Sequence, residues 1–258
     1  DNNAVLRHSE YAASSLALAF NPDGLYRYRH VPNDRRGFFN RFFSFLDPIY
    51  LEALRDFRTV LTQKNRLLKE QQTTSLPDWN QLFIEKACVI IKKRRETVMD
   101  LGEALAQRFQ ALTGREECLR LIYRPSLAEA PDEALVALTQ AQEQEQRAHH
   151  ALLGPHRDDF VFSLQPGRSE GYFSQGEYRS AYLALILALN ELLASRLQFR
   201  PLMILDDLFS ELDPQVRERL LHNLHTLPNQ IVVTTTDLSH LVPPRDAQIM
   251  EIQAGRVR

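Results

Sequence analysis

Residues 202–205 form an unbroken apolar run, Leu-Met-Ile-Leu, which ends directly in two acids, Asp206 and Asp207. Such a run is typical of a strand that is buried on both faces of a parallel sheet. Strand and helix patterns alternate around it: we expect strands at 160–164, 231–235 and 248–252, and helices at 175–198 and 214–224. This alternation predicts an α/β domain whose parallel sheet is covered by helices on both faces.

The two acids stand at the carboxyl end of the predicted strand, where open α/β sheets bind their ligands. This is the form of a Walker B segment, in which Asp206 would hold Mg²⁺ and Asp207 would orient or deprotonate the water that attacks a γ-phosphate. In the alternative interpretation, one acid caps a turn and the other is solvated. Residues 210–214 follow in the form of a D-loop, which in ABC-type ATPases lies beside the nucleotide at a dimer interface. Asp213 would help to bind the nucleotide there, or would cap a helix that begins at Pro214.

A second anion site is predicted at Ser174, Gln175 and Gly176, at the start of the long apolar helix. The free N–H groups and the positive dipole end of a helix attract anions, and a glycine lets a phosphate approach the backbone. The signature motif of ABC ATPases grips the γ-phosphate of a partner subunit in this way. The alternative is a core helix capped by Ser174. Thr236, after the strand at 231–235, occupies the position of the switch histidine of ABC ATPases and is a candidate catalytic residue.

The charge of the chain is nearly balanced, with 31 Lys and Arg against 33 Asp and Glu, so any surface for nucleic acid must be local. Residues 27–66 hold nine basic side chains against four acids, and residues 92–95 read Lys-Lys-Arg-Arg. We predict contacts with the DNA backbone, without reading of the base sequence, through Arg35, Arg36, Lys92 and Lys93. The alternative is that long helices carry solvated charges.

Composition excludes several classes of protein. Cys88 and Cys118 form no CxxC pair, so we expect reduced thiols in a cytoplasmic protein rather than disulfides or a zinc site. The longest apolar stretch, residues 181–189, is about half of the roughly 20 residues that cross a bilayer, so no membrane partner is predicted. The histidine pairs 149/150 and 222/225 lack a third ligand at a recognisable spacing, which argues against a metal site there.

The pattern along the chain divides it into three regions. Residues 1–33 are expected to be a remnant of an ATPase amino-terminal lobe, with strands at 16–20 and 25–29 joined by a turn at 21–24. Residues 34–150 are expected to form a mainly helical insertion: two long antiparallel helices, one past Pro48 and one from Asp78 to Gly114, a strand at 119–123, and a solvated polar helix within 129–145. Residues 151–258 are expected to be the ATPase carboxyl-terminal lobe.

Taken in order, these segments resemble the RecF family of bacterial recombination mediators, which is related to the SMC and ABC ATPases. The resemblance rests on Leu153-Gly154-Pro155-His156-Arg157-Asp158-Asp159, on the SQG-type signature and on the acid pair with its D-loop, and it extends to segments 20–23, 32–36, 45–47 and 63–68. It implies an ABC/SMC-type fold, ATP and Mg²⁺ as cofactors, and an ATP-dependent homodimer on DNA that helps to load RecA at gaps with RecO and RecR. His156 and Arg157 would face nucleotide or DNA, or Arg157 would pair with Asp158 or Asp159 in a structural turn.

The chain also departs from the family pattern. RecF proteins usually read SQGQQR, and Glu177 and Tyr178 replace the two glutamines, which would alter the grip on phosphate. No GxxxxGK[ST] motif occurs among the 258 residues, so hydrolysis of ATP is not expected from this segment alone. The P-loop of RecF lies near the amino terminus. We therefore expect a fragment of a longer, weak ATPase, or else a paralogue that serves as a non-hydrolysing scaffold for DNA or partners. A transporter subunit is not favoured, because it would carry LSGGQ and a switch histidine and this chain has neither. An SMC protein is not favoured either, because it would need hundreds of heptad residues between its lobes.

Overall fold

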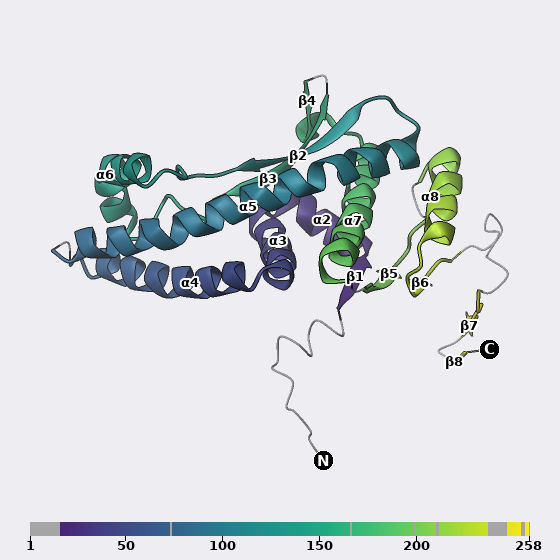
Figure 1. Cartoon of the computed structure of the whole chain (residues 1–258), viewed down its shortest axis with the longest axis horizontal. Coiled ribbons are helices and arrows are strands. Elements are labelled where there is room, and N and C mark those ends of the chain that lie inside the picture. The colour runs from purple at the N-terminus through teal and green to yellow at the C-terminus, as the bar shows by residue number, and fades with distance from the viewer. Residues whose placement is uncertain are drawn as a thin grey trace, which may run out of the picture.

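The computed structural model of the protein describes residues 16–257 apart from 73, 166, 199, 210–211, 237–246 and 254–255. In chain order its elements are β1 (Ala17–Phe20), α2 (Pro22–His30), α3 (Pro32–Leu46), α4 (Pro48–Lys69), α5 (Leu76–Thr113), β2 (Cys118–Arg124), α6 (Pro131–Ala148), β3 (Asp159–Gln165), β4 (Arg168–Ser169), the 3-10 helix η1 (Glu170–Tyr172), α7 (Gln175–Leu197), β5 (Leu202–Leu205), α8 (Pro214–Thr226), β6 (Ile231–Val233), β7 (Ile252–Gln253) and β8 (Arg256–Val257). A long arm built from α4 and α5, with α6 at its end, extends from a lobe that holds the parallel strands, α7 and α8 (Figure 1).

Three parallel strands form the sheet that the apolar run predicts. β5 lies in the centre, with β1 on one side and β6 on the other. Phe20 and Met203 are fully buried on the face that packs against α7, where the Phe20 ring lies 5.8 Å from that of Tyr182. Ala17 and Ala19, on the opposite face, are exposed. Among the described residues, helices therefore cover one face of this sheet, and cover on the second face is not seen.

Residues 22–30 form a helix, α2, so the strand predicted at 25–29 is wrong. Asn21 caps this helix by accepting a hydrogen bond from the N–H of Gly24, and Pro22 stands in its first turn. The Asn-Pro-Asp-Gly segment is thus a helix start rather than a hairpin turn. The alternating basic residues fill the last helical turn, where the helix dipole favours positive charge.

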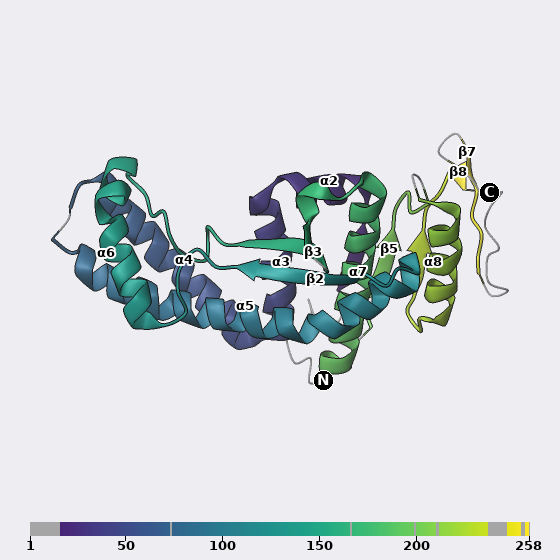
Figure 2. The ribbon, with the colours of Figure 1, turned by 90° about the horizontal axis from the view of Figure 1, so that it is seen from above.

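The two long helices are confirmed as an antiparallel pair. α4 and α5 lie side by side along the arm in both views and run in opposite directions (Figure 1, Figure 2). α5 ends at Gly114, which adopts a left-handed conformation with φ 69° that costs a glycine little. The 38 residues of α5 reach from the arm into the lobe, where they pack on α7 and α8.

α6 carries a buried acid, although a solvated polar helix is predicted here. Glu145 is 2% exposed and pairs with Lys64 of α4, with 2.8 Å between Oε2 and Nζ. Its other oxygen accepts a hydrogen bond from the N–H of Leu152. Burial lowers the pKa of Lys64 below its ordinary value. This ion pair fastens α6 to the arm.

β2, β3 and β4 form a second sheet, which is antiparallel. The strand predicted at 160–164 is confirmed as β3, but it pairs with β2 over its whole length and does not join the parallel sheet. The predicted division at residue 150 therefore falls between two paired strands. Phe160 and Phe162 on the inner face of this sheet are buried, whereas Arg120, Ile122 and Arg124 on the outer face are exposed.

Two strands near the carboxyl end are shorter than predicted. β6 ends at Val233, which leaves Thr234 and Thr235 beyond the strand. Residues 248–251 are not in a strand, and Ile252–Gln253 pairs with Arg256–Val257 in a short antiparallel hairpin. The early end of β6 places threonine hydroxyls at the edge of the parallel sheet.

α7 is the central helix of the lobe. By length and composition it is the one helix in the described part of the chain that could cross a membrane, but 67% of its apolar window is buried inside the protein. It packs against α3, α5 and β1. A helix surrounded by other elements needs apolar residues on every side, which explains its composition.

Candidate functional site

Asp206 and Asp207 form a turn at the carboxyl end of β5, as predicted. The hydroxyl of Thr234, just after β6, donates a hydrogen bond to Oδ1 of Asp206 and accepts one of 3.0 Å from the N–H of Asp207. Thr234 thus ties the ends of two neighbouring strands together. Asp207 has φ 47°, in the left-handed region that residues other than glycine seldom adopt. Strain of this kind is concentrated at functional sites.

Arg179, near the start of α7, holds the turn formed by Asp206 and Asp207, here called the acid turn, from inside the protein. It is 3% exposed, and its Nη2 donates a hydrogen bond of 2.6 Å to the carbonyl oxygen of Asp207. The guanidinium carbon lies 5.1 Å from the centre of the Phe20 ring, a favourable contact between a cation and an aromatic face. Arg179 belongs to α7 and contacts both Phe20 of β1 and the acid turn. It therefore connects the start of α7 to the acid turn.

Ser174, Gln175 and Gly176 are exposed at the start of α7. The Ser174 hydroxyl accepts a hydrogen bond of 3.2 Å from the N–H of Glu177, and the Glu177 carboxylate accepts one of 2.8 Å from the N–H of Ser174. This reciprocal pair is a capping box, so Ser174 does cap the helix, as the alternative interpretation predicts. A Cβ added at Gly176 would meet nothing within 4 Å, so the turn is open to an incoming group.

Glu177 brings a negative charge to this helix start. Arg168 donates a hydrogen bond of 2.8 Å to Oε1 of Glu177, and Arg115 donates to the same oxygen. Burial alone would raise the pKa of Glu177, but the hydrogen bonds from Arg168, Arg115 and the Ser174 N–H lower it to about 2. The carboxylate is ionised at neutral pH and already interacts with the positive end of the helix dipole. Tyr178, the other departure from SQGQQR, is 1% exposed and belongs to the core.

Two further predicted residues, Asp213 and Thr236, are exposed. Asp213 accepts a hydrogen bond of 2.9 Å from the N–H of Gln215 and so caps α8. Thr236 follows β6, yet the hydroxyl that contacts Asp206 belongs to Thr234. The first two residues of the predicted D-loop, 210 and 211, lie outside the described residues.

Sequence reasoning missed Thr234 and Arg179. The run of three threonines after residue 233 was a visible signal for the first, but it could not show which hydroxyl reaches the acids. Arg179 stands five residues after Ser174 in the signature segment and was visible too. Its role depends on the position of the acid turn, which lies 28 residues further along the chain.

The oxygen donors at the acid turn suit Mg²⁺. Asp206 is exposed, the Thr234 hydroxyl contacts its Oδ1, and its Oδ2 has no hydrogen-bond partner in the described part of the chain. Mg²⁺ prefers hard oxygen ligands, and it commonly binds one or two carboxylates while it keeps several waters. The described residues contain no group of three or more His, Cys, Asp or Glu that could hold a metal ion. Asp206 would hold the ion, and water and phosphate oxygens are further ligands that Mg²⁺ commonly takes.

Arg35 is not available to DNA, and its assignment as a DNA-binding residue is wrong. It is 4% exposed, and its Nε and Nη2 each donate a hydrogen bond of 2.8 Å to the Asp159 carboxylate. Its Nη1 donates to the carbonyl oxygen of Tyr28. The counter-ion lies 124 residues away along the chain, so a count of local charge overstates the free positive charge.

The other three predicted DNA residues differ in their availability. Lys93 forms an ion pair of 2.8 Å with Asp47, which removes it from a free basic surface. Lys92 is exposed and forms no ion pair with a described residue. Arg36 is half-buried and donates one hydrogen bond of 3.0 Å to the carbonyl oxygen of Asp158. Contacts of Arg36 and Lys92 with DNA stay predictions.

The segment 153–159 is a buried junction between the arm and the lobe. Arg94 of α5 is 1% exposed and Asp158 is fully buried. Arg94 donates hydrogen bonds to Asp158 Oδ2, Pro155 O, Asn40 Oδ1 and Tyr50 Oη over 2.6, 2.8, 2.9 and 3.1 Å. Asp158 also accepts hydrogen bonds from the Ser126 N–H and the Tyr123 hydroxyl. One ion pair therefore connects α3, α4, α5 and β2.

His156 and Arg157 lie in this junction but differ in exposure. Arg157 is exposed, and the predicted pairing with the two following acids does not form, because arginines of α3 and α5 hold both carboxylates. His156 packs against Phe57 and Phe83, with ring centroids 6.0 and 6.3 Å away. Burial lowers the pKa of His156 to about 4. It is neutral at pH 7 and suited to packing rather than to holding phosphate.

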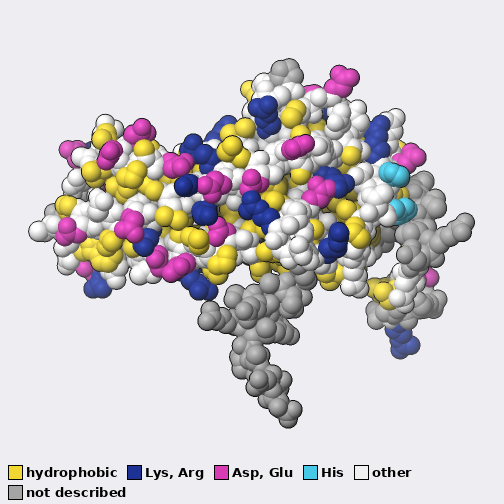
Figure 3. Space-filling view, in the orientation of Figure 1, with side chains coloured by type: hydrophobic (Ala, Val, Ile, Leu, Met, Phe, Trp, Pro, Cys, Tyr) yellow, Lys and Arg dark blue, Asp and Glu magenta, His cyan; other side chains and the backbone are white. Residues whose placement is uncertain are grey.

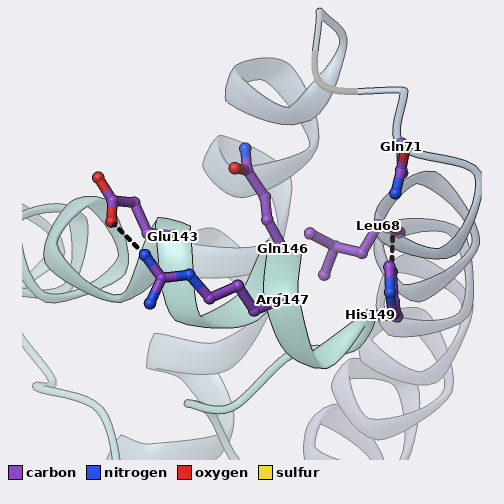
Figure 4. A pocket seen from close by; sticks show the side chains of 6 residues that line it. All are labelled: Leu68, Gln71, Glu143, Gln146, Arg147 and His149. Atoms are coloured by element: carbon purple, nitrogen blue, oxygen red, sulfur yellow. Dashed lines mark hydrogen bonds and ion pairs between the residues drawn. The ribbon is translucent and has the colours of Figure 1, made fainter.

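A hollow lies at the far end of the arm, between the ends of α4 and α6 (Figure 4). It is lined by Leu68, Gln71, Glu143, Gln146, Arg147 and His149. Arg147 pairs with Glu143 over 3.2 Å, and Nδ1 of His149 bonds to the carbonyl oxygen of Leu68 over 3.4 Å. These polar groups are directed at one another, so the hollow offers little to an anion.

Comparison with known proteins places the chain in a family. No protein-family model matches it. The DNA replication and repair protein RecF of Geotalea uraniireducens is 31% identical over 251 residues, which cover 93% of this chain and 68% of that protein. RecF of Herpetosiphon aurantiacus is 34% identical over 267 residues, or 99% of this chain and 69% of that one. A solved structure of the recombination mediator protein RecF-ATPrS in the RecFOR pathway matches with a TM-score of 0.78 at 25% identity, over 94% of this chain and 67% of its own. The predicted fold class is confirmed, and the chain belongs to the RecF family of DNA replication and repair proteins.

Proposed function

We propose that the chain is part of a RecF-type ATPase that dimerises on DNA when it binds ATP and assists the loading of RecA at gaps, together with RecO and RecR. The observation that carries the proposal is a pair of exposed turns, Asp206–Asp207 and Ser174–Gly176, which Arg179 connects. A neighbouring structure, with a TM-score of 0.77 to this fold, is described as RecF-ATP in the RecFOR pathway.

In this proposal each subunit supplies part of two nucleotide sites. Asp206 holds Mg²⁺ at the site of its own subunit, Asp207 orients the attacking water, and Thr236 stands at the switch position. The Ser174–Gly176 turn presents backbone N–H groups to the γ-phosphate that the partner binds. Nucleotide binding then favours the dimer, because ATP contacts both subunits only in that state. The site also needs a P-loop, which these 258 residues do not contain.

The test is ATP-dependent dimerisation of the intact gene product, measured by sedimentation with and without ATP and Mg²⁺. We expect Asp206→Asn to abolish the gain in dimer, because it removes the carboxylate charge that attracts the metal. Ser174→Arg should do the same, because a long side chain would fill the open turn. Matched controls are Asp132→Asn in α6 and Ser195→Arg near the far end of α7, both at exposed positions. They should dimerise like the unsubstituted protein.

Circular dichroism should first show that each variant keeps its helices, since Ser174 also caps α7. ATP-dependent dimerisation that persists unchanged in both site variants would refute the assigned roles. A protein that binds DNA but neither dimerises with ATP nor hydrolyses it would instead be the non-hydrolysing scaffold.

A further inference from the structure

The outer face of β2 carries two arginines that form no ion pair with an acid in the described part of the chain. Arg120 and Arg124 are exposed, and they lie on the same side of the strand because alternate residues of a strand share a face. Neither forms an ion pair or a hydrogen bond with any described residue. At about 3.3 Å per residue, their Cα atoms are roughly 13 Å apart. The backbone that holds them is rigid, because β2 pairs with β3 over its whole length.

Two more arginines continue this line at the start of β3. Arg124 lies opposite Asp159, the first residue of β3. Arg157, two residues earlier, is exposed, and Arg36 is bound to the backbone of the residue between them. Burial and the nearby positive charges of Arg94 and Arg157 lower the pKa of Arg36, against the opposite effect of Asp159 and Asp158. Arginines and acids therefore lie together where β2 ends and β3 begins, and both of these acids are held by buried arginines.

The acids near this line already have partners inside the protein. Asp158 pairs with Arg94, and Asp159 pairs with Arg35. Glu170 also faces Arg35, at 3.8 Å. These buried arginines bind the carboxylates, which still offset part of the charge of Arg124 and Arg36, since Arg124 lowers the pKa of Glu170 and Asp159 and Asp158 raise that of Arg36. In the described part of the chain, none of the four surface arginines forms an ion pair. Like charges that gather without counter-ions repel one another, and an external anion relieves this repulsion.

The shape of this surface suits an extended anion. β2 and β3 lie along the upper side of the molecule, with no helix drawn over them in the view from above (Figure 2). Lys and Arg side chains, with Asp and Glu side chains among them, lie on the hollowed upper edge between α6 and the β4 hairpin (Figure 3). One DNA strand carries a phosphate about every 3.4 Å along the helix axis, so two arginines roughly 13 Å apart can contact two different phosphates of one strand. A guanidinium group can bind phosphate oxygens with two parallel hydrogen bonds.

We propose that Arg36, Arg120, Arg124 and Arg157, here called the arginine line, hold the phosphate backbone of DNA along the outer face of β2. This inference rests on the proposed function, because it takes DNA as the partner. It replaces Arg35 and Lys93, which form ion pairs with acids of the protein, by surface arginines that form no ion pair with a described residue. The contacts position the backbone and read no bases, since phosphate contacts carry no sequence information of their own.

The test is the salt dependence of DNA binding by the intact protein in the presence of ATP, with two duplexes of unrelated sequence. Each phosphate contact contributes about 0.9 to the slope of log K against log salt, so Arg120→Gln/Arg124→Gln should reduce the slope by about 1.8. The loss of affinity should be equal for the two duplexes. The control is Arg55→Gln/Arg58→Gln, which removes two exposed arginines from α4, on the lower side of Figure 1 away from β2. It should keep the slope of the unsubstituted protein.

An unchanged slope in the β2 variant, or an equal decrease in the control, would overturn the arginine line. A loss of affinity for only one of the two duplexes would also overturn it, because that result would indicate contacts with bases. If the arginines bind an acidic protein instead of DNA, the salt slope of DNA binding would stay unchanged. The nucleotide site is tested separately, since the β2 variant should dimerise with ATP like the unsubstituted protein. Normal dimerisation with an unchanged slope refutes the arginine line alone. Persistent dimerisation in Asp206→Asn with a reduced slope in the β2 variant refutes the nucleotide site alone.

Discussion

Removal of the Asp158 carboxylate tests the buried junction between arm and lobe directly. Asp158 and Arg94 are 0% and 1% exposed, so neither charge is screened by water. Burial alone would lower the pKa of Arg94, but Tyr50, Tyr123 and Asp158 hold it above its ordinary value. In Asp158→Leu the guanidinium stays buried without its counter-ion, and the Ser126 N–H loses its acceptor.

The cost follows from the burial of the pair. Removing one partner of a buried ion pair costs about 3–5 kcal/mol, and we take about 4 kcal/mol for Asp158→Leu. That is a large part of the roughly 5–15 kcal/mol by which a native protein is stable. With a urea slope of about 3 kcal/mol per molar, the midpoint of unfolding should fall by about 1.3 M.

Urea unfolding, followed by circular dichroism and by the fluorescence of Trp79, the single tryptophan, measures this shift. Coincident curves from the two probes would support a two-state analysis. The double variant Arg94→Met/Asp158→Leu should be more stable than Asp158→Leu, because it leaves no unpaired buried charge. Asp132→Leu, at an exposed position in the first turn of α6, should change the free energy of unfolding by no more than about 1 kcal/mol, the usual contribution of an acid at a helix start. A midpoint shift below about 0.3 M, or a double variant no more stable than the single one, would refute the reasoning.

Two further predictions concern buried charge. His156 stays neutral in the folded protein down to about pH 4, whereas an unfolded histidine takes up a proton below about pH 6.5, so stability should fall by up to about 3 kcal/mol as pH falls between these values. The urea midpoint of His156→Gln should not vary with pH in this range through this group, whereas that of His225→Gln should vary like that of the unsubstituted protein. If the midpoint of His156→Gln falls with pH in parallel with that of the unsubstituted protein, the assignment to His156 is contradicted. Glu145→Leu should lower the free energy of unfolding at pH 7 by about 3 kcal/mol, because it leaves Lys64 buried without its partner. Lys64→Met/Glu145→Leu should regain part of that loss, and failure to do so would show that the ion pair is not the cause.

Local chemistry determined which segments are helices and strands. The apolar run before Asp206, the stop at Gly114 and the Ser174 start of α7 were all predicted from residues within a few positions of one another, and the structure confirms them. Strand burial, a glycine stop and a helix cap depend on neighbours in the chain, so a sequence contains the information. Residues 21–30 are one exception, because Asn-Pro-Asp-Gly chemistry suits both a turn and a helix start, and the strand predicted at 248–252 is another, since only residue 252 of it lies in a strand.

Tertiary structure alone decided which charges are free and which hydroxyl meets the acid turn. Arg35 and Asp159 are 124 residues apart in the chain, and the contact of Arg179 with the backbone at Asp207 spans 28 residues. Thr234 and Thr236 are chemically alike, and only the early end of β6 selects Thr234. A sequence shows where charges and hydroxyls occur, but their partners depend on which distant segments the fold brings together. For this chain the motifs determined the family, and packing determined which side chains are left to act on its surface.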